Sequence, residues 1–112
     1  RDLRAQRLGD EGAECMRRGD FDRAVELFSS ALRLLPPGDS DAEAAAAILA
    51  YRSCIYIRRK DWAAARDDLE QSLKLQPGNT KATYHLALVS KELGDVDRAR
   101  GLLGWLLLKD PK

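Results

Sequence analysis

The sequence is poor in the residues that build metal centres and covalent catalytic sites. It holds one histidine and two cysteines in 112 residues. The cysteines, Cys15 and Cys54, are far apart, and no set of His, Asp or Glu beside them has the spacing of metal ligands. We therefore expect no metal, no cofactor and no nucleophile–base pair, and we predict that the chain is not an enzyme.

The chain also lacks a large excess of charge of either sign and any long apolar run. Its 19 Lys and Arg residues nearly balance its 18 Asp and Glu residues, for a net charge of +1. Nucleic-acid-binding domains usually carry a clear basic excess, and a membrane span needs roughly 18 or more consecutive apolar residues. No signal peptide is visible at the N-terminus. These features, together with two separated cysteines, predict a cytoplasmic protein with no nucleic-acid or membrane partner.

What the sequence does contain is an internal repeat. Residues 19–36, 60–77 and 94–111 align, and each begins with a turn and an Asp and ends with a Pro. Two sets of matching residues are separated by 41 and then by 34 positions: Ala24, Ala65 and Ala99, and Pro36, Pro77 and Pro111. Because two independent markers give the same spacings, the register of the repeats is well fixed.

Each aligned segment is preceded by a stretch with helical spacing and no internal proline, at residues 3–18, 41–59 and 80–93. Each repeat is therefore predicted to be a helix, a short turn and a second helix that ends at proline. In the turns, Gly19 and Gly94 can take a positive φ, whereas Lys60 at the matching position would be strained. The side chains predicted to cap the second helices are those of Asp20, Asp61 and Asp95.

This period and pattern resemble the tetratricopeptide repeat (TPR) family, whose consensus is Trp-x2-Leu-Gly-x2-Tyr, then Ala-x3-Phe, then Pro. The resemblance covers nearly the whole chain, with departures at Glu11 and Arg52 in Leu places and at Cys15 and Ser90 in Tyr places. It implies an all-α fold, a right-handed superhelical array of helix-turn-helix units. The residues that match the family's small, alanine and apolar places are Gly12, Ala24, Phe28, Ser53, Tyr56, Ala65, Leu69, Ala87, Ala99 and Leu103.

We expect a single TPR domain over residues 1–112, with repeats at about 5–38, 46–79 and 80–112. A surplus of seven residues separates the first two repeats, and we place the insertion and an extended helix at about 39–45. From Asp41 the composition is alanine-rich, which predicts a first helix of repeat two lengthened by up to two turns. Ser40 would be its N-cap, with Glu43 completing a capping box. The alternative is a loop that tolerates insertion.

The resemblance implies a protein–protein interaction module, a scaffold, adaptor or co-chaperone-like domain that binds a peptide or helix of a partner in a concave groove. Carrying over the groove-facing places gives apolar, aromatic and basic side chains, which suit an acidic partner with apolar anchors. The alternative for the basic residues is a solvated surface, and we expect Arg52 and Arg59 to be solvated. The predicted groove residues are Arg17, Tyr51, Cys54, Arg58, Lys81, Tyr84, His85, Leu88 and Lys91.

Many TPR domains of chaperone cofactors hold the C-terminal carboxylates of heat-shock proteins with Lys, Asn and Arg side chains. The matching places here are Gly9, Ala13, Tyr51, Lys81 and His85. Only Lys81 fits fully, and His85 could substitute when it is protonated. Because the other hydrogen-bond donors that a doubly charged terminus requires are missing, we expect that a heat-shock-protein tail is not the partner.

The last helix carries more apolar residues than one packing face needs. We expect Leu103 and Leu106 to pack within the repeat, and a second stripe of Leu102, Trp105 and Leu108 to form an edge interface. This edge predicts a fragment of a longer protein or a homodimer through the last helix, and the two are compatible. A second alternative for function stays open, a substrate-recruiting or regulatory TPR segment of a larger multidomain enzyme.

Overall fold

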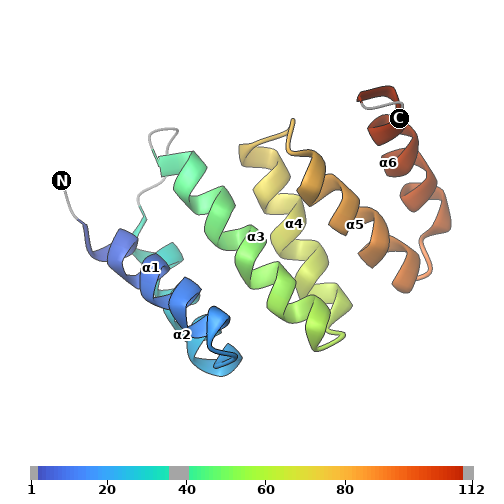
Figure 1. Ribbon diagram of the computed structural model, residues 1–112. Coiled ribbons are helices and arrows are strands. Elements are labelled where there is room, and N and C mark those ends of the chain that lie inside the picture. The colour runs from blue at the N-terminus through green and yellow to red at the C-terminus, as the bar shows by residue number, and fades with distance from the viewer. Residues whose placement is uncertain (1–2, 36–40, 110–112) are drawn as a thin grey trace.

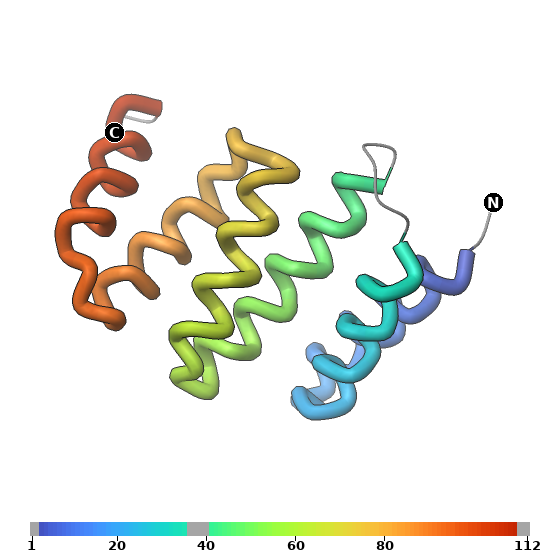
Figure 2. Tube along the Cα trace, turned by 180° about the vertical axis from the view of Figure 1, so that it is seen from behind, coloured from blue at the N-terminus to red at the C-terminus, as the bar shows by residue number. Residues whose placement is uncertain are grey.

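The computed structural model describes residues 3–35 and 41–109, and these residues form six α-helices and no strand. Figure 1 shows the helices as three hairpins side by side, with the two ends of the chain at opposite ends of the array, and Figure 2 shows the same order from behind. The predicted all-α repeat fold is confirmed. The helices are α1 (Arg4–Arg17), α2 (Phe21–Leu34), α3 (Ala42–Arg58), α4 (Trp62–Leu75), α5 (Thr80–Glu92) and α6 (Val96–Lys109).

The turn inside each hairpin has the predicted chemistry. The carboxylates of Asp20, Asp61 and Asp95 each accept a hydrogen bond from the backbone N–H three residues further on, at 3.2 to 3.4 Å. These bonds satisfy N–H groups that have no partner inside the helix. The residue before each Asp has a positive φ, 85° at Gly19, 60° at Lys60 and 87° at Gly94.

The core lies where helices of neighbouring hairpins meet. Phe28 of α2 and Ile55 of α3 are fully buried in one cluster, and Leu69 of α4 and Leu86 of α5 are buried in the other. Each cluster contains residues of two consecutive hairpins. One hairpin alone would therefore expose its share of the cluster to water.

Small residues allow the two helices of a hairpin to approach closely. A Cβ added at Gly12 of α1 would lie 2.7 Å from Cε1 of Phe28 on α2, closer than van der Waals contact permits. The corresponding residues of the next hairpins, Ser53 and Ala87, are buried as well. The close approach of the two helices that the sequence predicts at Gly12 is confirmed.

Helix α3 has 17 residues, compared with 14 in α1 and 13 in α5, so the extra residues add about one helical turn. The helix begins at Ala42, with Asp41 at the N-cap position and Glu43 in the first turn. The predicted N-cap, Ser40, lies outside the described residues. None of the helices that the structure describes combines the length and apolar character needed to cross a membrane.

The packing of α6 corrects our assignment of its two stripes. Leu102, predicted to face outward, is half-buried and packs against the cluster of α4 and α5. Leu103, predicted to pack inward, is 42% exposed. Residues 102–108 are apolar at nearly every position, so the sequence pattern does not select a face, and the placement of α4 and α5 decides which side of α6 is covered.

Candidate functional site

Helix α5 presents one exposed face that mixes basic, aromatic and apolar side chains. Lys81, Tyr84, His85, Leu88 and Lys91 recur at spacings of three and four residues, which places them on the same side of the helix. Tyr84 and Leu88 are 48% and 41% exposed, although both are large and partly apolar. This face can therefore offer charge and apolar contacts to the same ligand.

Lys81 connects this face to α3, because its charge acts on both Cys54 and His85. Burial raises the pKa of the Cys54 thiol, and the ammonium of Lys81 and a hydrogen bond with Ser53 oppose part of that rise. Burial lowers the pKa of His85, and the charge of Lys81 lowers it further. At neutral pH the site therefore presents a thiol, a neutral imidazole and an ammonium within electrostatic reach of one another.

A cavity of about 730 Å³ lies between α1 and α3. Its apolar lining includes Gly9, Ala13, Ala47 and Ile48, and the ring of Tyr51 forms part of its wall. The Tyr51 ring is 47% exposed and stacks on Phe28, with 5.9 Å between ring centroids. The charged residues that line the cavity are Asp10, Arg17, Asp41 and Glu43.

The remaining predicted groove residue, Arg58, lies apart from these two groups. The guanidinium of Arg58 lies over the ring of Phe21, 4.6 Å from its centroid, at the end of α3 that meets the first turn of α2. Lys91 is exposed in the last turn of α5. At the predicted edge interface, Trp105 is half-buried with the ammonium of Lys109 5.4 Å from its ring centroid, and Leu108 is 85% exposed.

Arg52 has a structural role that the sequence pattern did not predict. Its guanidinium donates two hydrogen bonds of 2.7 Å to the carboxylate of Asp68 on α4 and one of 2.9 Å to Oγ of Ser29 on α2. Asp68 is only 3% exposed. The expectation that Arg52 is solvated is therefore wrong, and Arg59, which forms an ion pair with Asp22, is not a freely solvated charge either.

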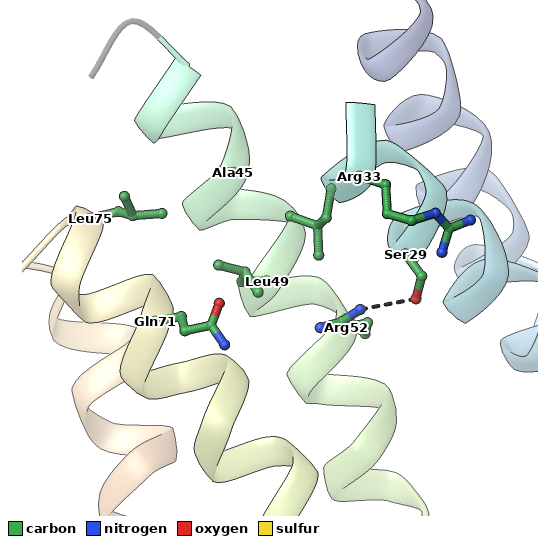
Figure 3. A pocket seen from close by; sticks show the side chains of 8 residues that line it. Ser29, Arg33, Ala45, Leu49, Arg52, Gln71 and Leu75 are labelled. Atoms are coloured by element: carbon green, nitrogen blue, oxygen red, sulfur yellow. Dashed lines mark hydrogen bonds between the residues drawn. The ribbon is translucent and has the colours of Figure 1, made fainter. Parts of the chain in front are cut away.

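A second, shallower pocket of about 390 Å³ lies where α2, α3 and α4 meet (Figure 3). Figure 3 shows Arg33, Leu49 and Gln71 around it, with the bond between Arg52 and Ser29 on its wall. Because Arg52 is bonded to Ser29 and Asp68, these polar groups already have partners within the protein. The cavity between α1 and α3 and the exposed face of α5 are therefore the stronger candidates for a binding site.

Comparison with known proteins places the chain among helical repeat domains. The family model of the tetratricopeptide repeat matches residues 56–112. Human sperm-associated antigen 1 is 29% identical over 104 residues, which are 93% of this chain and 10% of that protein. Rat FK506-binding protein-like is 33% identical over 105 residues, which are 90% of this chain and 29% of that protein. The chain thus spans less than a third of the length of either relative.

Solved structures share the fold along nearly the whole chain. The first TPR of Spaghetti (RPAP3), bound to the HSP90 peptide SRMEEVD, has a TM-score of 0.82 at 20% identity, covering 100% of this chain and 83% of that one. The second TPR domain of human RPAP3, in complex with the HSP70 peptide SGPTIEEVD, has a TM-score of 0.81 at 22% identity, covering 97% and 85%. The myosin chaperone UNC-45 from C. elegans, in complex with an Hsp90 peptide, has a TM-score of 0.84 at 25% identity, covering 99% and 12%.

These structures correct our expectation about the partner. We expected that a heat-shock-protein tail is not bound, because Gly9, Ala13 and Tyr51 lack the amide donors of a carboxylate clamp. That expectation is wrong, because domains of this same fold hold HSP90 and HSP70 peptides.

TPR domains are protein-interaction modules and are generally non-catalytic. The family model covers half of the chain, and the protein therefore belongs to the tetratricopeptide repeat family.

Proposed function

We propose that the groove formed by α1, α3 and α5 binds the acidic C-terminal peptide of a heat-shock protein, without covalent chemistry and without catalysis. The observation that carries the proposal is the exposed face of α5, where Lys81 and His85 lie beside Tyr84 and Leu88 and next to α3. The peptides held by the similar domains supply the ligand class to test.

The chemistry of this face matches such a peptide. The ammonium of Lys81 can donate charge-assisted hydrogen bonds to a carboxylate. His85 is neutral at pH 7 in the free protein, and a neighbouring carboxylate would favour its protonated form. Tyr84 and Leu88 offer apolar contact area to the side chains between the acidic residues. Because Gly9, Ala13 and Tyr51 provide no amide donors, we expect affinity to depend strongly on Lys81.

The test is a titration of the fluorescently labelled peptides SRMEEVD and SGPTIEEVD, followed by fluorescence anisotropy. We expect saturable binding that weakens as salt is added, because exposed charge pairs are screened. Lys81→Glu should weaken binding by about tenfold or more, since it turns an attraction into a repulsion. The matched control is Lys74→Glu, which reverses an exposed lysine in the last turn of α4.

Two results would refute the proposal. The first is the absence of saturable binding of either peptide to the folded protein. The second is equal binding by the wild type, Lys81→Glu and Lys74→Glu proteins, because binding would then not use the face of α5.

We also propose that the protein works in the cytoplasm. Cys15 and Cys54 are both free, and they lie on the different helices α1 and α3. Unpaired thiols persist in a reducing compartment. Protein isolated from cells in the presence of an alkylating agent and without reductant should carry the label on both cysteines, and a disulfide-linked species would count against this location.

A further inference from the structure

We propose that the groove where α2, α3 and α4 meet is a second docking surface, which takes an amphipathic helix of another protein with leucine-like side chains beside aspartate or glutamate. The inference goes beyond the proposed function and does not rest on it, because this groove and the cavity between α1 and α3 are lined by separate sets of residues. On α3, the groove is lined by Ala45, Leu49 and Arg52. Ala47 and Tyr51, which line the cavity, lie on another side of the same helix.

The groove is open because of the side chains at this particular junction of helices. By the spacing of the repeats, Ser29 of α2 corresponds to Glu70 of α4. By the same spacing, Gln71 of α4 corresponds to Trp105 of α6. At the junction of α4, α5 and α6, Glu70 forms an ion pair of 2.9 Å with Arg98, and Trp105 is half-buried. The smaller Ser29 and the exposed Gln71 leave the equivalent space of about 390 Å³ unfilled between α2 and α4.

Each of the three helices contributes a leucine to the groove. Leu49 of α3 is 4% exposed, Leu32 of α2 is half-buried, and Leu75 of α4 is 38% exposed. Figure 3 shows the side chain of Leu49 between the helices that carry Leu75 and Arg33. A leucine-like side chain of a partner would remove the exposed part of this apolar surface from water.

The charged side chains of the groove are basic. Arg33 and Arg52 are the charged residues among the described ones that line it. Arg52 is neutralised by the carboxylate of Asp68 at 2.7 Å. Arg33 is exposed and donates a hydrogen bond of 3.0 Å to Oγ of Ser30, and no carboxylate in the described part of the chain forms an ion pair with it. A carboxylate of the partner would be attracted to Arg33, and an ammonium would be repelled.

A helix suits this groove better than an extended peptide does. The lining residues belong to α2, α3 and α4, and the backbone N–H and C=O groups inside a helix bond to one another. The groove therefore offers the side-chain donors of Arg33 and Gln71, but no backbone partners for an extended chain. A helical partner satisfies its own backbone and presents apolar and acidic side chains three and four residues apart.

The experiment titrates the intact protein with two fluorescein-labelled helical peptides, followed by fluorescence anisotropy. The glutamate peptide, AELAALEAELAALEA, has leucines on one face with glutamates beside them, and the lysine peptide, AKLAALKAKLAALKA, has lysine in place of each glutamate. We expect the glutamate peptide to bind saturably and the lysine peptide to bind about tenfold or more weakly. Arg33→Glu should reverse this preference. Gln71→Trp, which introduces the residue type found at the equivalent place of α6, should fill the groove and weaken the binding of both peptides.

Matched controls make the same kinds of change away from the groove. Arg100→Glu reverses an exposed arginine of α6, and Ala63→Trp enlarges an exposed alanine of α4. Both control proteins should keep the wild-type affinity and the preference for the glutamate peptide. Circular dichroism verifies that each variant folds. Because Arg33 and Gln71 are both exposed, either variant keeps the test decisive if the other does not fold.

The inference is overturned if the glutamate peptide does not bind saturably, or if its binding is unchanged in the folded Arg33→Glu and Gln71→Trp proteins. It is also overturned if sedimentation shows that the wild type self-associates and Gln71→Trp does not, because a second copy of the chain would then occupy the groove.

The proposed function is tested separately from this surface. Lys81→Glu should leave the binding of the glutamate peptide unchanged, and an excess of unlabelled SRMEEVD should not displace it. Displacement by SRMEEVD, or loss of binding in Lys81→Glu, would place the helical peptide in the groove of α1, α3 and α5 and refute the second surface. If SRMEEVD does not bind at all, the proposed function fails, and the variants of Arg33 and Gln71 still decide the second surface.

Discussion

Gly12 shows how one missing methyl group sets the distance between two helices. An alanine there would place its Cβ 2.7 Å from the buried ring of Phe28. Gly12→Ala should lower the free energy of unfolding by about 1–2 kcal/mol, because overpacking costs more than the helix propensity that alanine gains. Urea denaturation measures the change.

The matched control for Gly12 is Gly101, which also lies inside a helix but has no atom within 4 Å of an added Cβ. Gly101→Ala should raise the free energy of unfolding by up to about 1 kcal/mol, through helix propensity alone. A denaturation midpoint that rises in both variants would contradict the close approach at Gly12.

Arg52 and Asp68 form a largely buried ion pair, with side chains that are 18% and 4% exposed and two hydrogen bonds of 2.7 Å between them. Asp68→Ala leaves the guanidinium of Arg52 without its carboxylate and should cost about 3 kcal/mol. The double variant with Arg52→Leu and Asp68→Leu should recover most of this loss, because apolar replacement of both partners removes the unpaired charge. A double-mutant cycle measures the coupling, and strictly additive costs would show that the pair does not act as a unit.

This pair could be predicted from the sequence only indirectly. Asp68 follows Arg52 by 16 residues and lies on a different helix, so helical spacing cannot connect them. The informative signal was that Arg52 occupies a place where the repeat pattern has leucine. A charged residue in a core position needs a buried partner, and Asp68 lies between two residues of the inward stripe of α4, Ala65 and Leu69.

At the scale of the hairpin, the turn between α3 and α4 carries strain that the other two turns avoid. Lys60 has a φ of 60°, in a region where a side chain is disfavoured, whereas Gly19 and Gly94 hold the equivalent positions elsewhere. Lys60→Gly should therefore raise the free energy of unfolding by about 0.5–1 kcal/mol. Gly94→Ala should lower the free energy of unfolding by a similar amount. Thermal denaturation measures both effects, and the melting temperatures of the two variants should shift in opposite directions. Equal shifts of the same sign would refute it.

The elements themselves were predictable because their ends carry local signals. Turn glycines, capping aspartates and closing prolines act within a few residues, so they define hairpins without knowledge of the rest of the chain. The face on which α6 packs was not predictable. Leu102 and Leu103 are equally apolar, and only their distance from α4 and α5 distinguishes the buried one from the exposed one.

At the scale of the whole molecule, binding and stability should respond to pH in opposite directions through His85. The pKa of His85 is lowered in the folded protein by burial and by Lys81, relative to an ordinary value of 6.5 in the unfolded chain. Below about pH 6.5 the unfolded chain therefore takes up a proton more readily than the folded protein does. The contribution of His85 to stability is present above that pH and is lost as the pH falls through the folded pKa.

The affinity for the peptide should depend on pH in the opposite direction to the stability. An acidic peptide near His85 favours the imidazolium, so binding takes up a proton and affinity should rise between pH 7.5 and pH 6, while the peptide carboxylates remain ionised. Over the same range the free energy of unfolding of the free protein should begin to fall. His85→Gln removes the titrating group, and both trends should flatten in this variant when denaturation and anisotropy are measured in parallel. If affinity rises equally in His85→Gln and wild type, the proton is taken up elsewhere, and the peptide does not meet the α5 face at His85.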